Sequence, residues 1–139
     1  MSKRLYNAQL LKTMTLFEKV TRTRLKDCFV DNNQLMTFVV TELYIGKAIG
    51  KNASNVKKLE NLLKRKIKII AFNPSPIKFV KNLIYPIIAE IDMQDQTILI
   101  KGQDTKTKGI LIGRNQSNLS NNLEIVQKYF KDIKNIRVI

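Results

Sequence analysis

The sequence predicts an α+β protein made of two similar units, each with a three-stranded sheet packed on helices. Three observations support this: a short sequence motif that occurs twice (the repeated phrase), the same predicted order of elements around each copy, and a proline-rich boundary between the copies. The phrase occupies residues 48–56 and returns at 111–119, an offset of 63 residues. Repetition at such a period indicates one structural unit used twice. We therefore expect one domain over residues 1–73 and another over 74–139.

The first unit is predicted to begin with a helix and a β-hairpin. Apolar residues recur at helical spacing over residues 7–20, which predicts a helix there. Residues 28–30 and 35–40 are rich in strand formers. The polar residues 31–33 between them tolerate turns, so the two strands are expected to pair as a hairpin.

Two helices around a glycine turn follow this hairpin in the prediction. A short helix opens at Thr41, which is expected to be its cap, and runs into the turn at Gly50. The next helix is expected to begin at Ser54 or Asn55, both of them good N-cap residues. An alternating strand over residues 66–70 closes the unit.

The second unit repeats this order after a boundary at residues 73–76, where two prolines interrupt helices and strands. Its predicted elements are a helix over 77–84, a hairpin of 87–92 and 97–101 around the turn 93–96, helices over 105–112 and 119–130, and a strand over 136–139. Each unit therefore has the order α-β-β-α-α-β.

Charge favours an anionic partner. The chain of 139 residues has a formal net charge of +14, and its isoelectric point is near 10. Residues 1–73 contain 15 basic and 5 acidic residues, whereas residues 74–139 contain 10 and 6. Because the charge is concentrated in the first half, we expect that half to bind more tightly.

Residue types needed for several other functions are missing. With no histidine and one cysteine, Cys28, the chain cannot assemble a Cys–His nucleophile or a zinc site. Its acidic residues are scattered, without a general acid–base pair. We therefore predict a non-enzyme with no cofactor, no metal and no small-molecule substrate, in which Cys28 is a small buried hydrophobe. No apolar run is long enough for a membrane span or a signal peptide, so we expect a cytoplasmic protein without membrane contact.

The repeated phrase has the chemistry of a phosphate-contacting turn. A glycine lets the backbone approach a ligand because it has no Cβ, and the following helix presents N–H groups and the positive end of its dipole. A lysine or arginine adds charge, and asparagine and serine donate hydrogen bonds. The candidate RNA-binding residues are Gly50, Lys51, Asn52, Ala53, Ser54, Asn55, Lys57 and Lys58 in the first unit, and Gly113, Arg114, Asn115, Gln116, Ser117 and Asn118 in the second.

A glycine turn between two helices, beside a three-stranded sheet, resembles the Gly-x-x-Gly turn of KH domains, which clamp about four nucleotides of single-stranded nucleic acid. With a helix first and a strand last, each unit is similar to the type II form. Two such units that fill the chain resemble the archaeal NusA-like transcription factors. Residues 27–31, 48–60 and 135–138 carry the resemblance, together with the second turn.

The resemblance implies a protein that binds single-stranded RNA, the nascent transcript, and modulates transcription elongation or termination, with RNA polymerase as a further partner. The sequence departs from the family pattern at the last glycine of each turn, where Ala53 and Gln116 stand. Alanine is the smaller change, so the first unit is expected to be the better binder. Two alternatives stay open: a ribosomal or ribosome-assembly KH protein that binds rRNA, and a protein-interaction scaffold with degenerate turns.

Overall fold

The structure is a computed structural model that describes residues 7–139. The chain is α+β and divides into two compact units, the first ending at Phe72 and the second spanning Asn73–Ile139. The division lies at the proline-containing segment. No helix within the described residues is long and apolar enough to cross a membrane.

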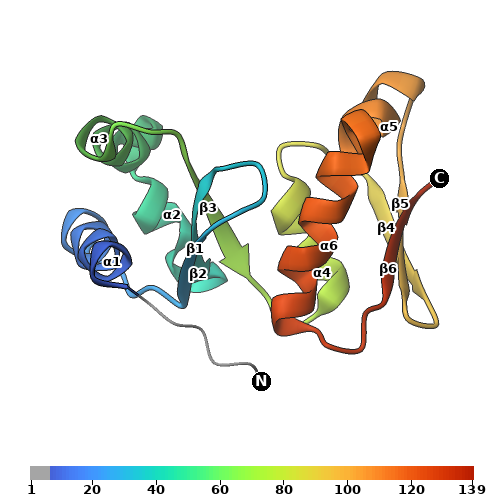
Figure 1. Cartoon of the computed structure of the whole chain (residues 1–139), viewed down its shortest axis with the longest axis horizontal. Coiled ribbons are helices and arrows are strands. Elements are labelled where there is room, and N and C mark those ends of the chain that lie inside the picture. The colour runs from blue at the N-terminus through green and yellow to red at the C-terminus, as the bar shows by residue number, and fades with distance from the viewer. Residues whose placement is uncertain (1–6) are drawn as a thin grey trace. The chain divides into compact units, whose positions relative to one another are not determined.

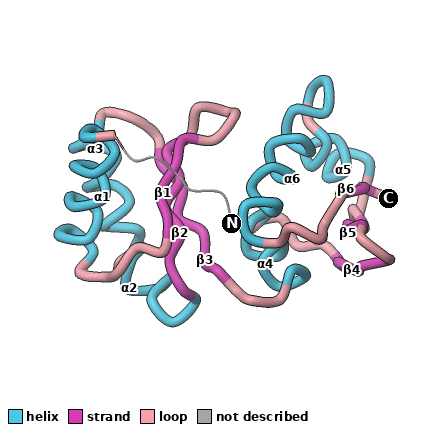
Figure 2. Tube along the Cα trace, turned by 60° about the horizontal axis from the view of Figure 1, so that its bottom comes forward, coloured by secondary structure: helices cyan, strands magenta, loops and turns pink. Residues whose placement is uncertain are grey.

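Unit 1 has a sheet with its three helices on one side (Figures 1 and 2). Its strands are arranged in the order β1-β2-β3, with β1 antiparallel and β3 parallel to the central β2. Its elements are α1 (Ala8–Thr21), β1 (Asp27–Val30), β2 (Met36–Thr41), a 3₁₀ turn (Glu42–Tyr44), α2 (Ile45–Ile49), a second 3₁₀ turn (Lys51–Ala53), α3 (Ser54–Leu63) and β3 (Ile67–Phe72).

Unit 2 repeats this topology with the sheet order β4-β5-β6, in which β4 is antiparallel and β6 parallel to β5. Its elements are α4 (Pro76–Ile84), β4 (Glu90–Gln94), β5 (Thr97–Lys101), α5 (Thr105–Ile112), a 3₁₀ turn (Arg114–Gln116), α6 (Ser117–Tyr129) and β6 (Asn135–Val138). The predicted order of elements is therefore observed in both units.

The core of unit 1 lies between its helices and its sheet. Phe17 of α1 stacks on Phe38 of β2, with ring centroids 4.3 Å apart, and both are fully buried. Ala48 of α2 belongs to the same buried cluster, which joins the glycine-turn region to the sheet. Cys28 is also buried there, with its sulfur 3.7 Å from that of Met36, which confirms the prediction that it is a small buried hydrophobe.

The core of unit 2 is built in the same way around Phe79 of α4. This ring is fully buried and makes an edge contact with Tyr129, with centroids 5.5 Å apart. Ile98 and Ile136 are buried partners in neighbouring strands. Each unit thus has its own buried core.

The hairpin of unit 2 is tighter than predicted. The sequence placed Met93 and Gln94 in its turn, but both belong to β4 and pair with β5. Only Asp95 and Gln96 connect the strands. Asp95 adopts a φ of 57°, the left-handed conformation that a short hairpin turn requires and that aspartate tolerates.

Topology fixes the place of the glycine turn in unit 1. Strand β2 ends at Thr41, which is paired with Phe72 at the end of β3. Helix α3 then leads to Ile67 at the opposite end of the sheet, where β3 begins beside Met36. The turn that precedes α3 therefore lies at the end of the sheet where β2 and β3 finish. The parallel pairing of β5 and β6 puts the turn of unit 2 at the equivalent end.

Candidate nucleic-acid interface

The two glycine turns have the same backbone conformation. Gly50 has φ 80° and ψ 166°, and Gly113 has φ 75° and ψ 169°. This region of backbone space is essentially restricted to glycine. The repeated glycine is therefore required by the backbone of the turn itself.

A Cβ at either glycine would also collide with the following helix. At Gly50 it would lie 2.7 Å from the Ser54 hydroxyl oxygen, and at Gly113 it would lie 2.8 Å from the backbone nitrogen of Asn118. The sequence assigned these glycines to close approach of a ligand. The structure adds an intramolecular role that the sequence did not reveal: each turn packs tightly against its own helix.

The two residues before each second helix are left-handed. Asn52 and Ala53 have φ values of 56° and 59°, and Asn115 and Gln116 have 54° and 62°. Asparagine tolerates this conformation, whereas a left-handed alanine or glutamine is strained. The sequence expected Ala53 to be the milder departure from glycine, but the backbone strain is shared by both units. Only the size of the side chain differs.

Helix α3 begins at Ser54, as predicted, but the residue expected to cap it needs correction. Its N-cap is Ala53, not Ser54 or Asn55, because Ala53 is the last non-helical residue and Ser54 is already helical. Alanine has no side-chain acceptor, and Gln116, the N-cap of α6, makes no capping hydrogen bond either. Neither N-cap side chain therefore satisfies the first N–H groups of its helix, which are the groups that bind anions elsewhere.

Asn55 and Asn118 tie each turn to the helix that precedes it. The side-chain amide of Asn55 donates to the carbonyl oxygen of Lys47 at 3.0 Å, and that of Asn118 donates to the carbonyl of Ile110 at 2.8 Å. The two bonds occupy equivalent positions in the repeat. They give a structural role to two amides that the sequence predicts to bind RNA, and that prediction is not tested by these bonds.

The other predicted residues of the first turn lie around it on the surface. Lys51 and Asn52 are exposed in the turn, and Lys57 and Lys58 are exposed one turn into α3. The predicted residues Gly50 and Ala53 are half-buried and Ser54 is exposed. In unit 2, Arg114, Asn115, Gln116 and Ser117 are exposed, whereas Gly113 is half-buried.

The helices that lead into the turns differ between the units. In α5, the carboxylate of Asp104 accepts a hydrogen bond from the backbone N–H of Thr107 at 2.7 Å. This bond, with a second from the Thr107 hydroxyl, lowers the pKa of Asp104. The equivalent residue of unit 1 is Thr41, predicted to be a cap, but its side chain makes no capping bond. The single helix expected after Thr41 is divided into a 3₁₀ turn and the short α2.

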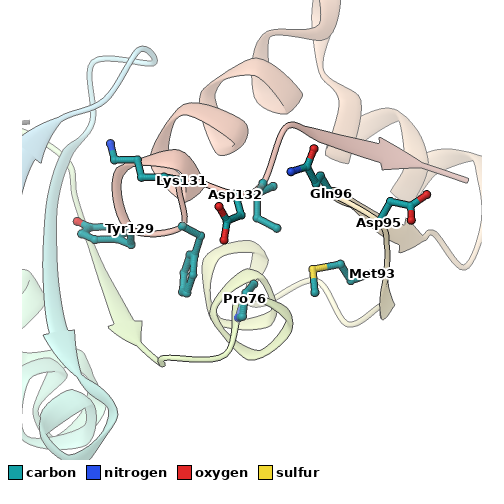
Figure 3. Close-up of a pocket in the computed structure, with 9 residues that line it drawn as sticks. Pro76, Met93, Asp95, Gln96, Tyr129, Lys131 and Asp132 are labelled. Carbon is teal, nitrogen blue, oxygen red and sulfur yellow. The ribbon is translucent and has the colours of Figure 1, made fainter. Parts of the chain in front are cut away.

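A pocket that the sequence did not predict lies at the other end of unit 2 (Figure 3). Its volume is about 430 Å³. The residues that line it come from the start of α4, the β4–β5 hairpin and the end of α6 with the segment that follows: Pro76, Met93, Asp95, Gln96, Tyr129, Phe130, Lys131, Asp132 and Ile133. It is separate from the glycine turn. Within residues 7–139 no three His, Cys, Asp or Glu side chains are grouped to hold a metal ion.

Comparisons with known proteins give the family. No family model matches the chain. A crystal structure of a protein called APE1850 covers 96% of this chain and all of its own, with a TM-score of 0.73 at 22% identity, so the two share a fold.

Curated archaeal proteins named as probable transcription termination protein NusA match over most of their length. The one from Methanocaldococcus jannaschii is 30% identical over 98% of this chain and 75% of its own. The Methanococcus vannielii protein is 28% identical over 96% and 78%, and that of Halobacterium salinarum is 28% identical over 90% and 91%. The chain therefore belongs to the family of archaeal NusA-like proteins.

Proposed function

We propose that the chain binds single-stranded RNA through two tandem type II KH domains and modulates transcription elongation or termination. The observation that carries this proposal is the pair of glycine turns with matching backbone angles, each at the start of a helix. The order α-β-β-α-α-β in both units, with the last strand parallel to the central one, supports the domain type.

The turn offers a phosphate three kinds of attraction. The start of α3 carries the positive end of a helix dipole and N–H groups that its N-cap residue cannot bind. Lys51 adds a full charge beside them, and Asn52 adds side-chain donors. In unit 2, Arg114 and Asn115 offer the same groups at the start of α6.

The extra cations around the first turn make unit 1 the stronger binder in this proposal. Lys57 and Lys58 lengthen its positive surface along α3, whereas Ser120 and Asn121 occupy the equivalent positions of α6. The relatives are named for transcription termination, which supports the nascent transcript as the RNA and RNA polymerase as a further partner.

Fluorescence anisotropy with a 12-nucleotide single-stranded RNA across a salt series tests the proposal. Lys51→Asp/Asn52→Asp is compared with Arg114→Asp/Asn115→Asp. Aspartate tolerates the left-handed conformation of both asparagines, so the turns should still form. The matched control is Asn61→Asp/Lys66→Asp, which makes the same charge change at exposed residues near the far end of α3.

We expect the first variant to lose binding almost completely, the second to weaken it less, and the control to change it little. Equal losses of RNA affinity in the two turn variants would show that both turns contribute equally to RNA binding. If the control weakens binding as much as the turn variants, the interaction is a nonspecific effect of net charge. The proposal would then be rejected in favour of a protein-interaction scaffold.

A further inference from the structure

The segment between α1 and β1 presents three cations to solvent. Arg22, Arg24 and Lys26 are exposed, and they alternate with Thr23, which is buried, and Leu25, which is half-buried. The sequence marks this stretch as basic, but the repeated phrase gives no reason to assign it a function.

Hydrogen bonds hold the backbone of this segment in place. The buried hydroxyls of Thr21 and Thr23 lie 2.8 Å apart, and that of Thr21 also donates to the carbonyl of Phe17. The backbone N–H of Leu25 donates to the carboxylate of Glu18 at 2.8 Å. The backbone N–H of Lys26 donates to the carbonyl of Val39 in the sheet at 2.8 Å. The cations are therefore displayed by an anchored segment.

The segment lies at the same end of unit 1 as the glycine turn. It leads into Asp27, which is paired with Val39 near the end of β2, the end of the sheet where the turn lies. The ammonium of Lys26 lies 4.2 Å from the ring centroid of Phe72, the last residue of β3. Leu25, from the segment, packs against the buried cluster that includes Ala48, two residues before the glycine.

These cations are not held in ion pairs within the described part of the chain, although Glu18 and Asp27 are near them in the sequence. No ion pair involves Arg22 or Arg24 among residues 7–139, and Lys26 contacts a ring. Unpaired cations on one anchored segment raise the local positive potential, which attracts an anion such as a phosphate.

Unit 2 shows that the fold does not need cations at this position. At the offset of 63 residues, residues 85–89 replace residues 22–26, and they contain no charged residue. Tyr85 and Ile88 are even 73% and 75% exposed. A connection of the same length between helix and strand therefore forms with uncharged residues, although its backbone differs at the helix end. The fold thus gives no general reason for three cations at this position.

We propose that Arg22, Arg24 and Lys26 form a second phosphate-binding surface of unit 1, which extends the RNA track beyond the first turn. This inference rests on the proposed function and deepens it. An RNA of four nucleotides occupies the turn, and a longer one also reaches residues 22–26.

The test compares Arg22→Gln/Arg24→Gln with Lys64→Gln/Lys66→Gln. The two pairs are closely matched: Arg22 and Lys64 are both left-handed C-cap residues, of α1 and α3, and the second exposed cation follows two residues later. Lys64 and Lys66 lie at the opposite end of the sheet from the turn. Each variant is measured by anisotropy with RNAs of 4 and 12 nucleotides across a salt series, together with Lys51→Asp/Asn52→Asp. Circular dichroism checks that each variant is folded.

We expect the Arg22/Arg24 variant to bind the 12-nucleotide RNA about ten-fold more weakly at low salt. The slope of log K against log salt concentration should be less steep by about 1.4, since each phosphate contact on a single strand contributes about 0.7 and the variant loses two contacts. Binding of the 4-nucleotide RNA should change less than about two-fold, because that RNA does not reach the segment. The Lys64/Lys66 variant should behave like the unmodified protein with both RNAs.

The outcomes separate this inference from the proposed function. If the Arg22/Arg24 variant behaves like the Lys64/Lys66 variant while the Lys51/Asn52 variant loses binding, the second surface is rejected and the turn stands. If the Lys51/Asn52 variant binds normally while the Arg22/Arg24 variant is weakened, the turn is rejected and the segment is the RNA surface. Equal weakening with both RNA lengths would reject an extended track, and equal weakening of all variants would reject both proposals.

Discussion

The two glycine turns have nearly the same backbone and different surroundings. The φ and ψ angles of Asn52 and Asn115 agree within 2°, and both turns are tied back by an asparagine amide. Around the first turn the exposed residues include Lys47, whereas Ile110 is half exposed at the equivalent position of the second. The glycines and the amides of Asn55 and Asn118, which both copies share, therefore shape the turn, whereas exposed residues around it differ between the units.

The two turns share one backbone conformation, but this similarity is not evidence that both bind a ligand equally well. Glycine and asparagine build the turn by intramolecular contacts, which exist whether or not RNA is bound. A difference in binding between the units would have to come from the side chains that differ around the turns. In unit 1 these are mainly lysine and arginine, and in unit 2 several are apolar or uncharged.

The largest stability effect is expected from alanine at the turn glycines. Gly113→Ala should lower the free energy of unfolding by about 3 kcal/mol, because its backbone is restricted to glycine and the new Cβ meets the backbone of Asn118. Gly50→Ala should cost about 2 kcal/mol, because the nearest atom there is the movable Ser54 hydroxyl. Urea denaturation measures both.

Gly46 and Gly109 provide the control for these substitutions. They are also equivalent in the repeat, but they lie in helices, and a Cβ on either has nothing within 4 Å. Alanine at these positions should raise stability by about 0.5–1 kcal/mol. Similar losses at all four glycines would contradict the assigned role of the turn backbone.

A smaller effect is expected from removing the asparagine amides. Asn55→Ala and Asn118→Ala should each lower the free energy of unfolding by about 1 kcal/mol, since each removes one hydrogen bond to a helix carbonyl. Stability that is unchanged by alanine at either position would show that the bond contributes nothing to the turn.

Restoring the last glycine of each turn is expected to stabilise both units slightly. Ala53→Gly and Gln116→Gly should each add about 0.5 kcal/mol, because relief of left-handed strain of about 1–2 kcal/mol is partly offset by the added freedom of the unfolded chain. The stability gains should be equal, but RNA affinity should rise more for Gln116→Gly, which removes the larger side chain. Thermal melts and anisotropy measure the two effects, and unequal stability gains would show that the strain is not shared.

The smallest effect concerns the cap of α5. Hydrogen bonds to the carboxylate lower the pKa of Asp104, so its contribution to stability is fully present above its ordinary pKa and is lost as the pH falls below about 4. Asp104→Asn stays neutral and should flatten the pH dependence of the thermal midpoint between pH 6 and 3. Thr41→Asp in unit 1 should introduce such a dependence by adding the missing cap. A Thr41→Asp protein with the pH profile of the unmodified chain would contradict this account.

Periodicity and repetition were sufficient to predict the order of the elements and the positions of the two glycine turns. The apolar spacing of residues 7–20 predicted α1 to within a residue at each end, and the predicted helix over residues 105–112 is α5. Local rules failed where the backbone is unusual. Capping preferences located the start of α3 but made Ser54 or Asn55 its N-cap instead of Ala53, because residue types do not reveal that Ala53 is left-handed.

Sequence rules could not predict the hydrogen bonds within the turns. The bond from Asn55 joins residues eight positions apart across a bend, a spacing that no helix or strand pattern implies. The signal that could have found it was the identity of Asn55 and Asn118 in the repeat, read as structural. The basic segment at Arg22 was visible, but its proximity to the turn follows only from the pairing of β1 with β2.

The hydrogen bonds of Asn55 and Asn118 also affect the step at which each turn loses its conformational entropy, which can be folding or ligand binding. Because each amide fixes its turn to the preceding helix during folding, the turn meets a ligand already in one geometry. Binding then does not have to order the loop, and less of the interaction energy is offset by lost chain freedom. The hydrogen bonds of Asn55 and Asn118 thus hold each turn in one geometry before any ligand is present.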